Sequence, residues 1–339
     1  MSRANPIDGF EVDPATLTYI GEDLHRPECI LAESDGSLWT ADSRGGVVHI
    51  RPDGGQKLIA PGAVANREPA KDEAARLTSG TLPNGLAFAR NGDILIANFG
   101  TDRLESMTRD GSLRVVADEI DGQPIGKVNF VLRDSRGRLW LTISTRIRNW
   151  MDAITPKLRD GYVALYDQGR VRIVADGIAF TNEIRLDAKE EWLYVAETTG
   201  RRITRFRVAE DGSLSGRDTF GPSDHGAFID GIAFDAFGNL WGTHVMTDRI
   251  FAITPDGDLR ILLDDDRGSA AGVALMEAFE RDAVTPELLL SCSGAIAPCF
   301  TSITFGGPDL STVYIGSLGS KRLPAFRSPV PGLAMVHWR

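Results

Sequence analysis

The chain repeats one short pattern of apolar and polar positions six times. Each copy reads as an apolar strand, a polar turn and a second strand with an aromatic or large aliphatic residue. The copies occupy residues 27–42, 83–98, 128–143, 181–197, 229–244 and 301–317. A further apolar strand follows each copy, and a fourth follows most of them. The pattern therefore predicts six units of four short strands.

Such units cannot bury both faces alone, whereas repeated β-units with Gly, Asp and Asn turns pack face to face around an axis in a propeller. We predict an all-β fold, a six-bladed β-propeller of four-stranded antiparallel blades, with residues 1–339 as a single domain. The apolar segment 16–22 is expected to pair with segment 333–338 in the last blade, which would close the ring and hide two strand edges. A sandwich or a parallel barrel fits less well, because helical patterns between the strands are nearly absent.

Three stretches interrupt the repeat, residues 60–82, 144–160 and 264–300. The last contains AAGVALMEAFERD, residues 270–282, whose pattern favours a helix. We expect residues 144–160 to form a surface loop. In the alternative, Trp150 and Met151 form an apolar flap over the channel, which would favour a hydrophobic substrate.

The residue that enters each predicted first strand is never apolar. These residues are Glu28, Asn84, Asn129, Asn182, Asp230 and Ser302. Because the first strand of each propeller blade lines the central channel, we expect them to form a ring at one mouth. The antiparallel second strand returns to the same mouth, so its last residues should add an outer ring. That outer ring would consist of Asp42, Asn98, Ile143, Glu197, His244 and Ser317.

Carboxylates and amides that converge in one narrow volume need a positive partner, since buried charges are paired or coordinate a metal. The donors are all oxygens, so the sequence predicts one divalent cation. Calcium is the first expectation, with magnesium, manganese or zinc as alternatives. The competing interpretation is a water-filled channel lined by ordinary polar residues.

The histidine and cysteine residues provide weaker indications of function. His244 could contact substrate or shuttle a proton, or it could serve in structural hydrogen bonding. Strand alternation directs Cys29 away from the channel. The three cysteines are expected to be reduced, although a bridge between Cys292 and Cys299 remains an alternative.

The charge balance argues against nucleic acid. The 339 residues include 37 Lys and Arg against 47 Asp and Glu, a net charge of -10, and no basic cluster offers a surface for a phosphate backbone. The sequence shows neither a secretory signal pattern nor an apolar run long enough to span a bilayer. We expect a cytoplasmic protein without a membrane partner, and the sequence leaves its oligomeric state open.

Four motifs and one longer segment make the sequence resemble a known family. The motifs are Glu28 in RPECI, Lys127-Val128-Asn129 ahead of VLRDSRGRLWL, Thr181-Asn182 ahead of EIRLDAKEEWLYVAET, and Asp230-Gly231 in IDGIAFDAFGNLW. The segment is TSITFGGPDLSTVYIGS, residues 301–317. Across residues 25–336 the chain is similar to the six-bladed propellers of the gluconolactonase, senescence marker protein and luciferin-regenerating enzyme group.

The resemblance implies a single divalent ion at the channel mouth, held by Glu28, Asn182 and Asp230. It also implies that Asn129 contacts substrate or completes the coordination shell, and that Lys127 is a basic residue toward the substrate. One position departs from the pattern, because Glu183 follows Asn182 where related enzymes commonly have glycine. We expect Glu183 to alter the local backbone or to add a charge near the ion.

These features lead to the hypothesis of a metal-dependent hydrolase that opens a lactone, a small-molecule substrate. Asp230 would act as general base, while Glu28, Asn182 and Asn129 hold the ion. Lys127, Asn129, Asn84 and His244 would contact the substrate. One alternative is a hydrolase of phosphorus esters on the same metal site. The other is a metal-free propeller that serves as an interaction platform or catalyses another reaction.

Overall fold

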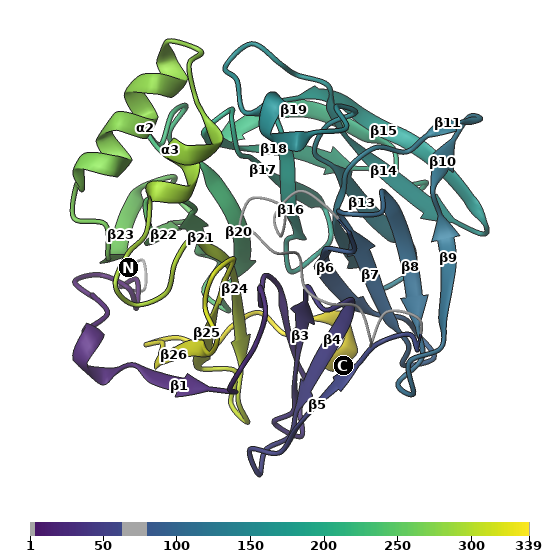
Figure 1. The fold of residues 1–339 in the computed structure, drawn as a ribbon, viewed down its shortest axis with the longest axis horizontal. Helices are drawn as coiled ribbons and strands as arrows, with labels where there is room; N and C mark the ends of the chain where they lie inside the picture. Colours follow the sequence, from purple (N-terminus) through teal and green to yellow (C-terminus); the bar gives the residue numbers. More distant parts are fainter. Residues whose placement is uncertain (1–3, 63–79, 339) are drawn as a thin grey trace.

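The computed structural model describes residues 4–62 and 80–338 and confirms the predicted six-bladed propeller (Figure 1). Blade one consists of β2 (Ile30–Ala32), β3 (Leu38–Asp42), β4 (Gly46–Ile50) and β5 (Gln56–Ile59), and blade two of β6 (Pro83–Phe88), β7 (Ile94–Asn98), β8 (Arg103–Met107) and β9 (Leu113–Ala117). Blade three consists of β12 (Val128–Arg133), β13 (Leu139–Ile143), β14 (Gly161–Asp167) and β15 (Arg170–Ile178), and blade four of β16 (Thr181–Leu186), β17 (Trp192–Glu197), β18 (Arg202–Val208) and β19 (Leu214–Phe220).

Blade five consists of β20 (Ile229–Phe234), β21 (Leu240–His244), β22 (Arg249–Ile253) and β23 (Leu259–Asp264). Blade six combines β24 (Phe300–Gly306), β25 (Thr312–Ser317) and β26 (Leu323–Arg327) with the N-terminal β1 (Thr18–Ile20). All pairings within the blades are antiparallel. The first strands of neighbouring blades contact one another in turn, which places them around the channel. A short hairpin, β10 (Glu119–Ile120) and β11 (Gln123–Pro124), leads into blade three.

The ring closes through the N-terminal strand, as predicted, but its partner differs from the prediction. β1 pairs with β26, with Thr18 opposite Ala325 and Ile20 opposite Leu323. The expectation that segment 333–338 is this partner is wrong. A proline is usually excluded from a strand with neighbours on both sides, so Pro324 weakens the strand pattern of β26. The alternation of apolar and polar residues in segment 333–338 is more typical of a strand than the sequence of β26 is.

Segment 333–338 instead covers the end of the channel where the first strands finish. It contains the 3-10 helix η3 (Val336–Trp338). The backbone N–H of Leu333 donates to the carbonyl of Phe234 at 2.8 Å, and the ring N–H groups of His337 and Trp338 donate to the carbonyl of Ala32 at 2.8 and 2.9 Å. The C-terminal segment therefore lies across this end of the channel, where Leu333, Met335 and Val336 help to line a second cavity.

The recurring tryptophans have a structural explanation. Trp39, Trp140 and Trp241, each on the second strand of a blade, are fully buried. Each indole N–H donates to an acid six residues earlier, which is Glu33, Asp134 or Asp235, at 2.6, 3.1 and 2.8 Å. Trp192 differs from these three: it is only partly buried, and Arg205 and Arg207 stack over its ring.

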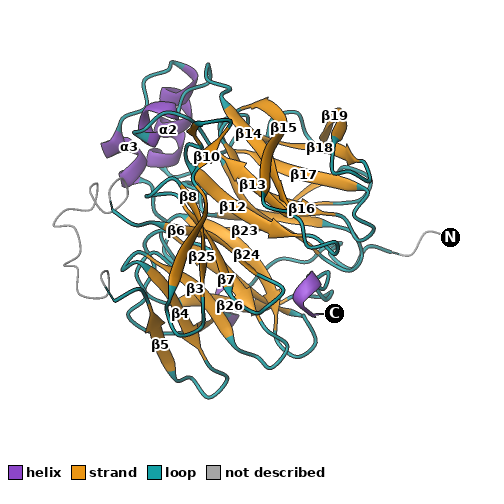
Figure 2. Cartoon of the chain, turned by 90° about the vertical axis from the view of Figure 1, so that its right-hand side faces the viewer, coloured by secondary structure: helices purple, strands orange, loops and turns teal. Residues whose placement is uncertain are grey.

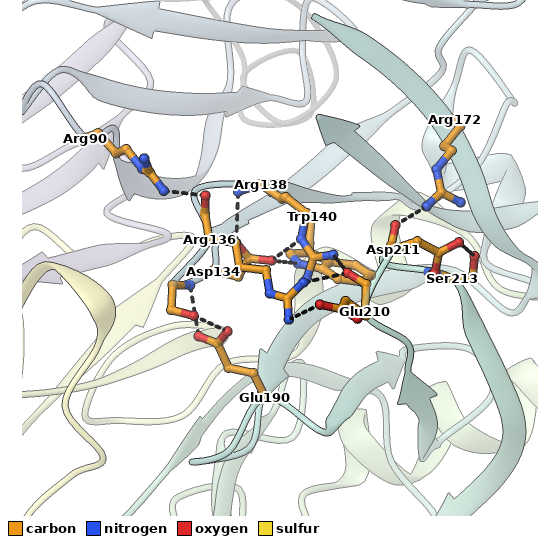
Figure 3. Close-up of polar contacts among 11 residues, drawn as sticks. Arg90, Asp134, Arg136, Arg138, Trp140, Arg172, Glu190, Glu210, Asp211 and Ser213 are labelled. Carbon is orange, nitrogen blue, oxygen red and sulfur yellow. Dashed lines mark hydrogen bonds and ion pairs between the residues drawn. The ribbon is translucent and has the colours of Figure 1, made fainter. Parts of the chain in front are cut away.

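The turn that contains Asp134, between β12 and β13, joins two neighbouring blades (Figure 3). Asp134 accepts from the ring nitrogen of Trp140 and from Nε of Arg138 at 2.7 Å. Arg138 and Arg136 also donate to the backbone carbonyl of Glu210, which belongs to blade four. These residues lie away from the channel mouth and stabilise the contact between blades three and four.

Both α-helices of the described residues lie in an insertion. Residues 264–300 contain α2 (Ala270–Glu280), which confirms the predicted helix, and α3 (Pro286–Ser291). Ser269 caps α2 by accepting from the N–H of Gly272, and Thr285 caps α3 by accepting from Leu288. Residues 144–160 contain the 3-10 helix η2 (Trp150–Ala153), and η1 (Pro14–Thr16) precedes β1. Figure 2 shows α2 and α3 gathered at one end of the molecule.

Two further predictions can be compared with the structure. All three cysteines lie in the described part of the chain and none forms a disulfide, so the alternative of a Cys292–Cys299 bridge is wrong. Among residues 4–62 and 80–338, no helix has both the length and the apolar character to cross a bilayer. Most of the predicted insertion 60–82, namely 63–79, lies outside the described residues.

Candidate active site

Five of the six predicted ring residues line one cavity at the mouth where the first strands begin. They are Glu28, Asn84, Asn129, Asn182 and Asp230, and each comes from a different blade. The cavity has a volume of about 590 Å³, part of which is open to solvent. Ser302, the sixth member, is buried but does not line it. The structure thus brings together residues that are up to two hundred positions apart in sequence.

β-Bulges aim the ring side chains into the cavity. In blade five, Ile229 pairs with His244 and the ladder resumes with Ile232 opposite Gly242, so Asp230 and Gly231 face a single residue. The same two-against-one irregularity places Asn84 and Asn182. Such bulges redirect side chains next to functional sites.

The bulges also explain why the predicted outer ring does not face the cavity. Glu197 pairs with Thr181 and His244 with Ile229, and paired residues share one face of a sheet. Thr181 and Ile229 each precede a ring residue and therefore point to the other side. The residues that line the cavity come one position after the outer-ring residues and are Phe99, Thr198, Val245 and Leu318. The predicted outer ring is therefore wrong by one position in each of these four blades.

The ring carries unpaired acceptor oxygens. Oε2 of Glu28, Oδ1 of Asn129, Oδ1 of Asn182 and Oδ1 of Asp230 are buried and accept no hydrogen bond from any described residue. Buried acceptors are rarely left without a partner, because removing them from water costs free energy. Four convergent oxygens from carboxylates and amides are the ligands that hard divalent cations prefer. The donor set therefore fits a divalent cation.

Asn84 occupies a different role in this ring. Its Oδ1 accepts from Nη2 of Arg26 at 2.8 Å, and its Nδ2 donates to the backbone carbonyl of Asn129 at 3.1 Å. Both ends of the amide are therefore engaged. Asn84 links the ring to Arg26 and is not a member of the unpaired oxygen set.

The two acids of the ring repel each other in this buried volume. Burial raises the pKa of Glu28 well above its usual range, and the charge of Asp230 raises it further. Burial also raises the pKa of Asp230 to about 7, with a contribution from the charge of Glu183. Arg26 lowers the pKa of both acids. A positive ion among these carboxylates would relieve the same repulsion.

Glu183, which follows the ring residue Asn182, is a buried acid. It is 1% exposed, with one carboxylate oxygen 2.9 Å from Nη2 of Arg185 and 3.2 Å from the backbone nitrogen of Ile232. Burial raises the pKa of Glu183 to about 7, against the lowering effect of Arg185. The equivalent positions in blades two and five are Gly85 and Gly231. A Cβ at Gly231 would lie 2.4 Å from the carbonyl oxygen of Thr301, so the strands at that bulge approach too closely for a side chain.

Arg26 is a charged cavity residue that the sequence analysis missed. It lies two positions before Glu28, adopts a φ of 57°, and donates from Nη1 to the carbonyl of Pro83 at 3.0 Å. Its buried Nε has no partner among the described residues. A sequence signal exists in hindsight, since Phe180 and Phe228 also stand two positions before a ring residue and also line the cavity. Arg26 and Phe180 share a positive φ, 57° and 52°, just before the first strand of their blades.

Two predicted substrate-contacting residues lie outside the cavity lining. The ammonium group of Lys127 is 2.8 Å from Oδ1 of Asp102 and is 3.4 Å from the carbonyl of Phe99. His244 is buried, with Nε2 at 3.0 Å from Nδ1 of His225 and its ring stacked on Phe251. Their roles toward substrate stay predictions.

Within the described residues, no group of three or more His, Cys, Asp or Glu side chains could hold a metal ion. The candidate site therefore depends on its two amides as well as on its two acids.

Comparison with known proteins agrees with this architecture. The sequence profile of the SMP-30/Gluconolactonase/LRE-like region matches residues 27–263. The chain is similar to the adipocyte plasma membrane-associated protein of Salmo salar (28% identity over 229 residues, 65% of this chain and 53% of the relative). It is also similar to the 6-deoxy-6-sulfogluconolactonase of Pseudomonas putida (24% identity over 155 residues, 45% of this chain and 43% of the relative). The matches thus span about half or less of these relatives.

Solved structures show the same fold. A gluconolactonase from Xanthomonas campestris superposes with a TM-score of 0.65 and 18% identity, covering 93% of this chain and 89% of that protein. The calcium-binding protein regucalcin from Agrobacterium tumefaciens superposes with a TM-score of 0.65 and 16% identity, covering 95% and 98%. At such identities the likeness establishes the propeller alone.

Proposed function

Because the chain belongs to the SMP-30/gluconolactonase/LRE-like family, we propose that it is a metal-dependent hydrolase that opens a lactone. The observation that carries the proposal is the set of four buried, unpaired oxygens from Glu28, Asn129, Asn182 and Asp230 in one cavity. Two relatives support the reaction and the ion: one is named a sulfogluconolactonase and one a calcium-binding regucalcin. Calcium is the ion we favour, since the donors are oxygens.

The four ring oxygens would hold the ion, which supplies Lewis-acid polarisation of the lactone carbonyl when bound. Asn182 is already oriented for this task, because its Nδ2 donates to Oγ1 of Thr198 at 3.1 Å and leaves Oδ1 facing the cavity. Asn129 contributes the same kind of oxygen from the neighbouring blade.

Asp230 is the residue we assign as general base. It would take a proton from a water molecule while the water oxygen bonds to the carbonyl carbon. The ring C–O bond then breaks, and the proton passes to the leaving alkoxide oxygen, so that the product is a hydroxy acid. Arg26 would pair with the new carboxylate, because its Nε is buried in the cavity without a partner among the described residues.

The first test is the metal content of purified protein. Elemental analysis after calcium loading should give one divalent ion per chain, and chelation should abolish hydrolysis of a lactone panel in a folded protein. Re-addition of calcium, magnesium, manganese or zinc should restore activity to different extents. Full activity after complete chelation would refute the proposal, as would the absence of hydrolysis of every lactone by the loaded protein.

A further inference from the structure

The cavity has two chemically distinct parts. Among the described lining residues, the polar ones are the five of the ring together with Arg26 and Thr198. Beyond them the walls are apolar and include Phe99, Trp150, Ile154, Phe180, Phe228 and Leu289. A ligand whose reacting group sits at the ring would therefore meet hydrocarbon and aromatic surface on these described walls.

Separate insertions of the propeller build these walls. Ile154 follows η2, and Leu289 belongs to α3, so the stretches 144–160 and 264–300 meet above the channel mouth. Ile154, Phe228 and Leu289 are buried in one apolar cluster with Phe279 of α2. The ring of Trp150 meets those of Phe99 and Phe180 edge to face, with centroids 6.1 and 6.3 Å apart. The stretch 144–160, predicted as a surface loop, therefore contributes Trp150 and Ile154 to the apolar walls, whereas Met151 of the alternative flap does not line the cavity.

Backbone geometry supports the same interpretation. Phe180 and Met246 have φ values of 52° and 69°, a region that bulky residues rarely adopt. Both line the cavity. Strained residues of this kind persist where the surrounding structure holds them, often at binding sites.

We propose that the substrate of this site is a lactone with a hydrocarbon substituent, which the apolar walls bind while the ester lies at the ring. This inference rests on the proposed function and specifies its substrate class. A sugar lactone would bury several hydroxyl groups against Phe180, Phe228 and Leu289, where no described side chain pairs with them, at a loss on the order of tenfold in affinity for each. Each methylene buried there would instead gain about fourfold.

A series of lactones tests the substrate class. With the calcium-loaded protein, kcat/KM should rise at least about tenfold from γ-butyrolactone through γ-hexalactone to γ-nonalactone, and D-glucono-1,5-lactone should be a poorer substrate than γ-nonalactone. Equal rates along the series, or a preference for the gluconolactone, would overturn the inference and leave the proposed lactonase activity intact.

A binding measurement separates the two proposals. The non-hydrolysable 5-pentyl-2-pyrrolidinone should bind to the loaded protein in calorimetry, and Leu289→Gln should weaken that binding about tenfold. Ile154→Thr provides a milder second variant if Leu289→Gln fails to fold, and Leu113→Gln, on exposed strand β9, is the matched control. Binding without hydrolysis of any lactone would refute the activity and support the apolar site. Absence of binding, or equal binding by all folded variants, would refute the apolar site.

Discussion

Oγ1 of Thr198 accepts a hydrogen bond from Nδ2 of Asn182 at 3.1 Å and donates its own proton to the carbonyl of Ile229 at 2.7 Å. The hydroxyl thereby fixes which end of the Asn182 amide faces the cavity. Replacing Thr198 with the nearly isosteric valine removes this orientation. We expect Thr198→Val to weaken calcium binding about tenfold or more, because partners that orient metal ligands have effects of this size.

The measurement is a calorimetric titration of the metal-free protein with calcium. Thr199→Val is the matched control, since the hydroxyl of Thr199 is buried nearby and has no hydrogen-bond partner among the described residues. Equal calcium affinities of the two variants would show that Thr198 does not orient a ligand.

Replacing the proposed general base should separate catalysis from folding. Asp230→Asn keeps the size of the side chain and removes a charge that repels Glu28, so the variant should fold with unchanged or higher stability in the absence of metal. Its kcat on the best lactone should fall by about a hundredfold or more, a typical effect of losing a general base. Thermal unfolding and steady-state kinetics at saturating calcium check both parts, with Ser302→Ala as the control at the ring position that does not line the cavity. An active, folded Asp230→Asn protein would remove this acid from the mechanism.

The repeat of apolar and polar positions was sufficient to predict the blades, because each strand pair buries a face with period two. The closing strand was harder to identify. Pro324 interrupts the pattern of β26, whereas segment 333–338 alternates like a strand and yet lies across the channel end. Local pattern could not separate these segments, since the difference depends on which of them meets β1.

The ring was predictable because six polar residues occur where apolar ones belong, and the structure gathers five of them in one cavity. The cavity residues just after the second strands were not predictable. Each bulge inserts one residue and so changes which side chains of the two strands share a face. Arg26 escaped prediction for a related reason: it turns into the cavity through a φ of 57°, a conformation that its residue type does not suggest. The apolar walls come from insertions, whose packing no repeat specifies.

The buried pair of Glu183 and Arg185 should be sensitive to removal of one partner. Arg185→Met leaves the Glu183 carboxylate buried without its ion pair, and we expect a loss of about 3–5 kcal/mol in the free energy of unfolding. The double variant Glu183→Gln with Arg185→Met should recover much of this loss, because it leaves no unpaired charge. Urea denaturation at pH 8 measures all three proteins. Arg327→Met, which breaks the exposed pair with Asp309, serves as control with an expected loss of no more than about 1 kcal/mol; comparable losses in both single variants would contradict the prediction.

Arg26 should affect substrate and product binding. Arg26→Met removes a guanidinium whose Nε lies unpaired in the cavity and whose Nη2 holds Asn84 at 2.8 Å. We expect KM for the best lactone to rise about tenfold and inhibition by the hydroxy-acid product to weaken, with Arg26→Lys intermediate because lysine cannot reproduce the planar fork. Initial-rate kinetics with added product provide both constants. Arg103→Met, at an exposed ion pair with Asp118, is the control, and unchanged product inhibition in Arg26→Met would argue against this role.

The pair of His225 and His244 should make the folded state sensitive to acid. Burial lowers the pKa of His225 to about 4 and lowers the pKa of His244 well below its usual range. Between pH 6.5 and 4 these histidines are therefore protonated in the unfolded chain and neutral in the folded chain. The free energy of unfolding falls as the pH falls through this window. For His225 the loss approaches about 2 kcal/mol at pH 5, from 1.4 kcal/mol per pH unit. Urea denaturation at pH 7 and pH 5 should show a smaller loss for His225→Gln than for the wild-type protein, and the same loss in both would mean that His225 is protonated in the folded state.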